Sequence, residues 1–255
     1  MTDAPIPLTD SFLSRPIAHR GYHDIGAGRP ENSRAAIRAA IEHGYGIELD
    51  LQLSKDAQAM VFHDYDLKRL TGEAGAIQQR AAHDLAKMTL LHGDESIPSF
   101  AEVLAIVAGR VPLLVELKDQ DGAMGPRVGA LEHATAIALK DYEGDVAVMS
   151  FNPHSVAAFG NHNTGRPLGL TTEAFQQKKN TLLPAATRRY LRDIPDFDRV
   201  GASFISHDVN DLHSAAVARL KARGVPVLCW TVRSKEVEID ARKIADNVTF
   251  EGYAA

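Results

Sequence analysis

Alternation of apolar and polar side chains is clearest between residues 46 and 53, where Glu48, Asp50 and Gln52 lie between isoleucine and leucine side chains. This period of two residues is typical of a β-strand. Similar short apolar runs recur along the whole chain. They predict eight strands: Ile17–His19, Gly46–Leu53, Pro112–Lys118, Val146–Phe151, Pro167–Thr172, Ala202–Ser206, Val225–Val232 and Asn247–Glu251.

The segments between these strands have the period of amphipathic helices. Residues 99–109, SFAEVLAIVAG, begin with Ser99 and Glu102 in the spacing of a capping box and end at Gly109. Strands that alternate with helices predict an α/β fold, a parallel (β/α)8 TIM barrel. An open doubly wound sheet is the alternative, but the chain lacks the glycine-rich nucleotide-binding fingerprints that would support it.

The stretch from residue 57 to residue 99 interrupts this alternation. AMVFHD, residues 59–64, follows the second strand after only the five residues SKDAQ, which is too short for a helical crossover. We therefore expect a hairpin strand that returns His63 and Asp64 toward the end of the second strand. The remainder of this stretch would form a small excursion from the barrel.

Length and composition favour one domain over residues 1–255. A chain of 255 residues with 45% apolar content can bury the core of a single α/β barrel. The net charge of −5 argues against nucleic acid or an anionic membrane surface as the main partner. Residues 1–16 lack the apolar core of a signal peptide, and no apolar run is long enough to span a bilayer. We expect a cytoplasmic protein without stable membrane association, and the oligomeric state stays open.

The acidic residues of the second strand face one side. In a barrel strand, side chains point alternately to the lumen and to the surrounding helices, so the leucines would pack outward while Glu48 and Asp50 point inward. These two residues would lie roughly 6.5 Å apart along the strand. The run LLVELK repeats the pattern and directs Glu116 and Lys118 inward. Three carboxylates would therefore converge at one mouth of the barrel.

Converging carboxylates repel one another and are costly to desolvate. One divalent cation with oxygen ligands would remove this conflict, and such ligands favour Mg²⁺ or Ca²⁺ over zinc. The alternative is a structural network in which the acids pair with Arg20 and Lys118. Two histidines, His19 in AHRG and His63 in FHD, follow predicted strands and favour a functional site.

Seven motifs occur in a fixed order from about residue 16 to the C-terminus: AHRG, PEN, IELDLQLS, VFHDYDLKRLTG, LLVELK, SFNP and CWTV. This ordered set resembles the glycerophosphodiester phosphodiesterases, which have a phospholipase C-like TIM barrel. The resemblance implies a divalent cation and the hydrolysis of small-molecule glycerophosphodiesters to glycerol 3-phosphate and an alcohol. It also implies the site: Glu48, Asp50 and Glu116 as metal ligands, His19 and His63 as the acid/base pair, Arg20 and Lys118 as phosphate contacts, and Trp230 beside the glycerol.

Three segments depart from the usual family pattern. The motif PENS has Ser33 in place of threonine, and both Asn32 and Ser33 are candidate helix caps. The loop over residues 22–29 is longer than in many members. The C-terminal NVTFEGYAA lacks the common ending, so the contribution of the last strand to the pocket stays open.

Two other activities and one binding function are alternatives on the same barrel. A lysophospholipase D or a phosphatidylinositol phospholipase C-like enzyme would need an apolar groove for an acyl chain, and no exposed apolar run requires one. A non-catalytic phosphate-ester binding protein would not need both histidines and all three carboxylates. Because all five are present, hydrolysis is the favoured function.

Overall fold

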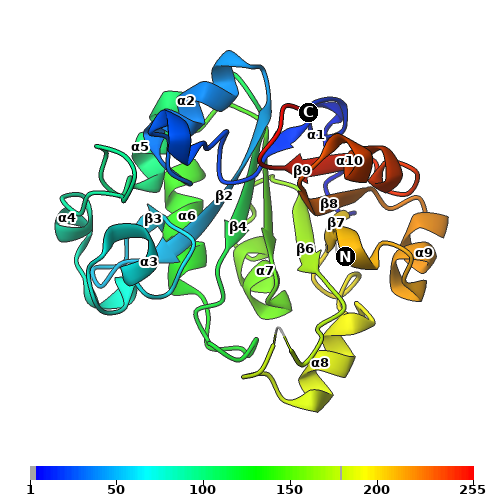
Figure 1. Cartoon of the computed structure of the whole chain (residues 1–255). Helices are drawn as coiled ribbons and strands as arrows, with labels where there is room; N and C mark the ends of the chain where they lie inside the picture. The colour runs from blue at the N-terminus through cyan, green and yellow to red at the C-terminus, as the bar shows by residue number, and fades with distance from the viewer. Residues whose placement is uncertain (1–3, 179) are drawn as a thin grey trace.

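The computed structural model describes residues 4–178 and 180–255. Residues 1–3, which begin the segment expected to lack the apolar core of a signal peptide, lie outside the described residues. Eight parallel strands form a closed barrel, because β1 pairs with both β2 and β9 (Figure 1). The barrel strands are β1 (Ile17–Ala18), β2 (Gly46–Leu53), β4 (Leu113–Leu117), β5 (Val146–Ser150), β6 (Leu168–Thr172), β7 (Phe204–Asp208), β8 (Val227–Val232) and β9 (Asn247–Phe250). The predicted (β/α)8 TIM barrel is confirmed.

Most of the helices connect the strands and cover the outside of the barrel. The α-helices are α1 (Asp10–Ser14), α2 (Arg34–Glu42), α3 (Lys68–Thr71), α4 (Ala82–Leu85), α5 (Phe100–Val107), α6 (Ala130–Leu139), α7 (Pro153–Gly160), α8 (Ala185–Arg192), α9 (Ala215–Ala222) and α10 (Lys235–Ala241), and the 3-10 helices are η1 (Ile25–Ala27), η2 (Ile77–Gln79) and η3 (Val209–Asp211). The predicted capping box begins α5, with reciprocal hydrogen bonds between Ser99 and Glu102. Among the described residues, the helices are too short or too polar to cross a membrane.

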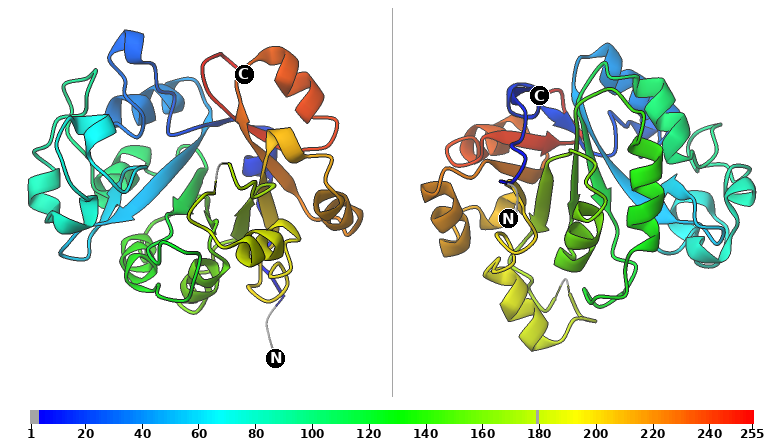
Figure 2. Two further views of the ribbon diagram at one scale, coloured as in Figure 1. Left: turned by 60° about the horizontal axis from the view of Figure 1, so that its bottom comes forward. Right: turned by 180° about the vertical axis from the view of Figure 1, so that it is seen from behind.

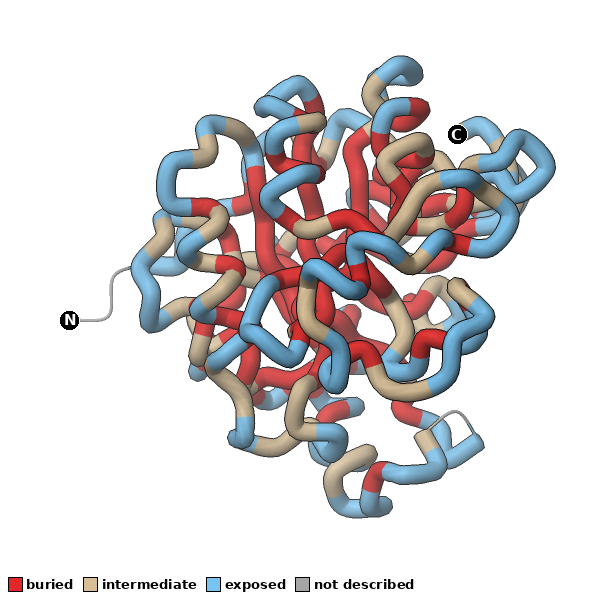
Figure 3. Tube along the Cα trace, turned by 90° about the vertical axis from the view of Figure 1, so that its left-hand side faces the viewer, coloured by how far each residue is buried: buried red, intermediate tan, exposed pale blue. Residues whose placement is uncertain are grey.

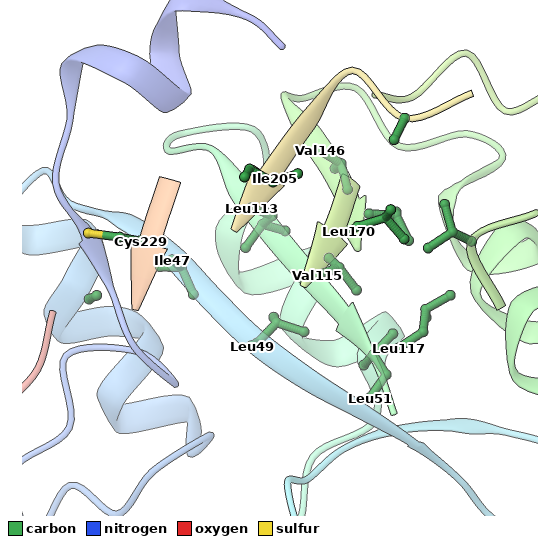
Figure 4. Packing of buried hydrophobic residues seen from close by; sticks show 14 of the residues in the cluster. Ile47, Leu49, Leu51, Leu113, Val115, Leu117, Val146, Leu170, Ile205 and Cys229 are labelled. Atoms are coloured by element: carbon green, nitrogen blue, oxygen red, sulfur yellow. The ribbon is translucent and has the colours of Figure 1, made fainter. Parts of the chain in front are cut away.

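Outward-facing side chains of the strands form the main core. Leu49 and Leu51 on β2 and Leu113 and Val115 on β4 are fully buried against the helices (Figure 4). Burial is therefore concentrated in the strands, while the exposed residues lie on the outer helices and loops (Figure 3). The prediction that the leucines pack outward is confirmed, and the polar residues of the same strands must face the lumen.

One end of the barrel lumen is filled by apolar side chains. Phe12 of α1 packs there with Leu114, Phe204 and Leu228, and all four are buried. The side-chain amide of Asn247 on β9 holds α1 in place by donating to the backbone oxygen of Phe12 at 2.7 Å. The sequence pattern did not predict this short helix.

The hairpin excursion is present as predicted. β3 (Ala59–Val61) pairs antiparallel with β2, with Leu51 opposite Val61. Residues beyond β3, including α3 and α4, lie to one side of the barrel (Figure 2). This excursion has its own apolar cluster, formed by Met60, Phe62, Leu67, Leu70, Ile77, Leu85, Leu90 and Ile97. A separate small core thus buries most of the apolar side chains of the excursion.

Candidate active site

A cavity of about 160 Å³ lies at the carboxyl ends of the strands, opposite the end that Phe12 fills. Parallel strands place the side chains at their carboxyl ends around one mouth, which is where TIM barrels carry their functional groups. The structure brings all eight predicted site residues to the wall of this cavity: His19, Arg20, Glu48, Asp50, His63, Glu116, Lys118 and Trp230.

The three carboxylates come from the neighbouring strands β2 and β4. Asp50 lies opposite Glu116 in the strand register, and Glu48 is two residues earlier on the same face. One oxygen from each of the three lies within 4.8 Å of the others, and all three side chains are buried. The predicted convergence of these acids is therefore present.

The surroundings of Glu48 differ from those of the other two acids. Glu48 accepts a hydrogen bond from the backbone N–H of Arg20 at 2.9 Å and lies 3.9 Å from Nε2 of His19. Neither the backbone N–H nor the imidazole is a permanent cation. Burial, reinforced by the charges of Asp50 and Glu116, raises the pKa of Glu48 well above its ordinary value. An additional positive charge at this point would stabilise the carboxylate, which fits a cation held by the three acids.

Asp50 is already surrounded by positive charge. Its Oδ1 lies 2.7 Å from Nζ of Lys118, and its Oδ2 lies 3.4 Å from Nε of Arg20. Burial alone would raise the pKa of Asp50, but the charges of Lys118, His63 and Arg20 outweigh it and hold this pKa well below its ordinary value. The ion pairs that the sequence suggested as an alternative are therefore present within the same cluster of acids.

His19 and His63 face the cavity in similar settings. Nδ1 of His19 lies 2.5 Å from Oε2 of Glu251, and Nδ1 of His63 lies 2.6 Å from Oδ1 of Asp64. Burial lowers the pKa of His19, partly offset by its hydrogen bond to Glu251. Since Nδ1 of each ring already contacts a carboxylate, Nε2 is the nitrogen that is left to interact with a ligand.

Trp230 forms part of the apolar wall. Its ring meets that of Phe151 edge-on, with 5.4 Å between the centroids, and its Nε1 donates to the backbone oxygen of Ser206 at 3.0 Å. The hydrogen bond fixes the indole while leaving its ring in the cavity wall.

Asn32 and Glu251, which the sequence analysis did not assign to the site, contact predicted site residues. Asn32 donates from Nδ2 to Oδ2 of Asp50 at 2.9 Å, while Ser33 caps α2. Glu251 contacts His19, as described above. A signal for Glu251 was present, because it directly follows the last barrel strand, as His19 directly follows the first.

Comparisons with known proteins find relatives of this chain. A glycerophosphodiester phosphodiesterase of Caldanaerobacter subterraneus is 33% identical over 149 residues, and one of Bacillus altitudinis is 30% identical over 156 residues. These matches cover 55% and 58% of this chain and 59% and 62% of the relatives, so the chain spans less than two thirds of either relative.

The barrel is also found among solved structures. An Oleispira antarctica phosphodiesterase, solved in complex with the product sn-glycerol-3-phosphate, matches with a TM-score of 0.76 at 21% identity, over 94% of both chains. At this identity the likeness concerns the fold. The model of the glycerophosphoryl diester phosphodiesterase family matches residues 19–250, a range that contains all eight predicted site residues. The chain therefore belongs to the glycerophosphoryl diester phosphodiesterase family.

Proposed function

We propose that this chain hydrolyses glycerophosphodiesters to glycerol 3-phosphate and an alcohol, using one divalent cation and the His19–His63 pair. The observation that carries the proposal is the single cavity that collects three carboxylates, two histidines and the cationic side chains of Arg20 and Lys118. Each group has a use in phosphodiester hydrolysis, in which negative charge builds on the phosphate and a poor leaving group must depart.

Glu48, Asp50 and Glu116 would hold the cation. Their oxygen donors suit a hard ion, Mg²⁺ or Ca²⁺, and the weakly compensated charge of Glu48 fits such an ion. When bound, a divalent cation neutralises charge that builds on the phosphate oxygens.

Lys118 and Arg20 would bind the phosphate. An ammonium group can donate three hydrogen bonds, and those from Lys118 to Asp50 and Glu116 account for two. The third donor is available for a phosphate oxygen. Arg20 is held by Glu31 at 2.6 Å, which keeps its guanidinium at the edge of the cavity.

The histidines would divide the proton transfers. One imidazole removes the proton of the attacking hydroxyl, which the family resemblance suggests is the substrate's own glycerol hydroxyl. The other protonates the departing alcohol oxygen, which leaves a cyclic phosphate that water then opens to glycerol 3-phosphate. Trp230 would contact the apolar face of the glycerol. We further propose that residues 1–255 form one domain of a cytoplasmic protein that binds no nucleic acid and has no stable association with membranes.

A substrate panel tests the proposal and its alternatives together. The purified chain is assayed with glycerophosphodiesters, lysophospholipids and phosphatidylinositol, before and after chelation and with Mg²⁺, Ca²⁺ or Mn²⁺ added back. We expect turnover of glycerophosphodiesters that chelation abolishes and one of these ions restores. Glu48→Gln should weaken metal binding, whereas Glu236→Gln, at an exposed position on α10, should not. Full activity in metal-free protein would contradict the proposed site.

A further inference from the structure

Barrel closure places Glu251 beside His19. His19 directly follows β1, Glu251 directly follows β9, and these two strands pair with each other. The backbone N–H of His19 donates to the oxygen of Phe250 at 2.9 Å, so the chain just before Glu251 is held against His19. The 2.5 Å separation of Nδ1 from Oε2 thus depends on strand pairing rather than on a loop.

The carboxylate of Glu251 is itself held in place. Arg233, just after β8, lies with Nη2 2.7 Å from Oε1, while His19 takes Oε2. The backbone N–H of Glu251 donates to the oxygen of Val232 at 3.0 Å. Burial alone would raise the pKa of Glu251, but His19, His23 and Arg233 outweigh it and keep this pKa well below its ordinary value. A fixed, ionised carboxylate therefore faces one nitrogen of His19.

We propose that Glu251 is a positioning residue for His19, holding the proton on Nδ1 so that Nε2 faces the cavity as the nitrogen that exchanges a proton with the substrate. A neutral imidazole that donates from Nδ1 has its acceptor at Nε2. Nε2 of His19 lies on the side of Glu48, 3.9 Å from Oε2 of that residue. The proposal rests on the proposed function, since it specifies how one of the two histidines acts.

A second metal site is the competing interpretation. His19, His23 and Glu251 have ligand atoms within 4.8 Å of one another. However, this group contains one carboxylate, whose charge Arg233 already balances at 2.7 Å, whereas three carboxylates converge at the proposed cation site. His23 is 3.5 Å from Oε2, longer than the 2.5 Å contact of His19. Both facts favour a hydrogen-bonded carboxylate and histidine over a metal centre.

Glu251→Gln is the first variant to measure. It keeps the size of the side chain and removes its charge. We expect kcat to fall about 10²-fold or more, the scale of lost acid–base catalysis, with KM and metal content unchanged. Glu238→Gln is the matched control, because Glu238 is a buried glutamate that pairs with Lys235 and Arg242 away from the cavity. Its kcat should equal that of the wild type.

A double-mutant cycle distinguishes positioning from a general structural effect. If Glu251 acts through His19, Glu251→Gln should cause no further loss of kcat in a His19→Ala background. If the fold losses of kcat from the two substitutions multiply in the double variant, the two residues act independently and the proposal is overturned. So would two bound ions in the wild type and one in Glu251→Gln.

Spectroscopy provides a readout that does not depend on activity. In the ¹⁵N spectrum of the histidine rings, wild-type His19 should carry its proton on Nδ1, and Glu251→Gln should shift that proton toward Nε2 or mix the two tautomers. An unchanged His19 tautomer in the variant would overturn the proposal. If the wild type hydrolyses no glycerophosphodiester while the tautomer still depends on Glu251, the proposed function fails and the Glu251–His19 relationship stands.

Discussion

The ammonium nitrogen of Lys118 lies 2.7 Å from Oδ1 of Asp50, across the two strands that carry the acidic cluster. The same nitrogen lies 2.5 Å from Oε1 of Glu116, and Lys118 is itself buried. Burial alone would lower the pKa of Lys118, but the two carboxylates outweigh it and raise this pKa above its ordinary value. One side chain thus balances the charge of two of the proposed metal ligands, and in the proposed function the same side chain binds the phosphate.

Lys118→Met should have opposite effects on turnover and on metal binding. The variant loses a charged donor to the phosphate, so kcat should fall about 10²-fold. It should bind Mg²⁺ or Ca²⁺ more tightly, because no ammonium competes for Asp50 and Glu116. Steady-state kinetics and calorimetric metal titration measure the two effects. Lys221→Met, which removes an exposed pair with Asp246, is the control. An unchanged kcat would limit Lys118 to a structural role.

A change of leaving group should assign His19 and His63. The proposed natural substrate, a glycerophosphodiester, releases a poor alkoxide that needs a proton, whereas a nitrophenyl ester of glycerol phosphate releases a stable phenolate. The alanine variant of the general acid should lose about 10²-fold on the natural substrate and recover much of that loss on the ester. The other variant should stay slow on both substrates, because its nucleophile still has to be deprotonated. Metal content is measured in each variant, and equal losses on both substrates for both variants would contradict this division.

The ion pairs of Arg69 should make the free energy of unfolding depend on pH in the acidic range. It binds Glu31 at 2.8 Å and Asp64 at 2.6 Å, joining the segment before α2 to the end of the hairpin. Burial alone would raise the pKa of Asp64, but hydrogen bonds from His63 and Arg69 outweigh it and hold this pKa well below its ordinary value. The pKa of Glu31 is likewise lowered, with Arg69 and Arg20 outweighing burial.

A carboxyl with a lowered pKa in the folded protein stabilises the fold above its unfolded pKa, about 4, and this stabilisation is lost as the pH falls toward the folded value. Arg69→Met should therefore lower the free energy of unfolding at pH 7, by about 1 kcal/mol because solvent screens the half-exposed Arg69. The difference in the free energy of unfolding between the variant and the wild type should shrink at about pH 3, where both carboxyls are protonated in the unfolded chain. Urea unfolding at both pH values is the measurement, and an equal difference at both would contradict it.

Gly169→Ala should destabilise the barrel. A Cβ at this position on β6 would lie 2.3 Å from Cζ of Phe204, whose ring is fully buried in the filled end of the lumen. Overpacking of this kind costs about 1–3 kcal/mol. Adding Phe204→Leu should recover part of that loss, because the smaller side chain relieves the contact. Urea unfolding of both variants is the test, and an unaffected single variant would show that the ring can move aside.

The strands and the inward-facing acids could be predicted because the two-residue period is visible within a short stretch of sequence. In a closed barrel, this period directly separates the side chains that face the lumen from those that face the helices. The contact of Glu251 with His19 could not be read in this way, since it joins residues 232 positions apart through the pairing of the first and last strands. Asn32 was also missed as a partner of Asp50, because a cap and a cavity contact look alike in sequence. The five-residue helix α1 is too short to show a helical period.

The packing of Phe12 with Leu114, Phe204 and Leu228 has a consequence for how molecules reach the site. Because apolar side chains fill that end of the lumen, the substrate and both products of the proposed hydrolysis must all pass through the opposite mouth. A product that has not yet departed therefore blocks the next substrate. If the chain carries out the proposed hydrolysis, glycerol 3-phosphate should be a competitive inhibitor, and its rate of escape should set an upper bound on turnover.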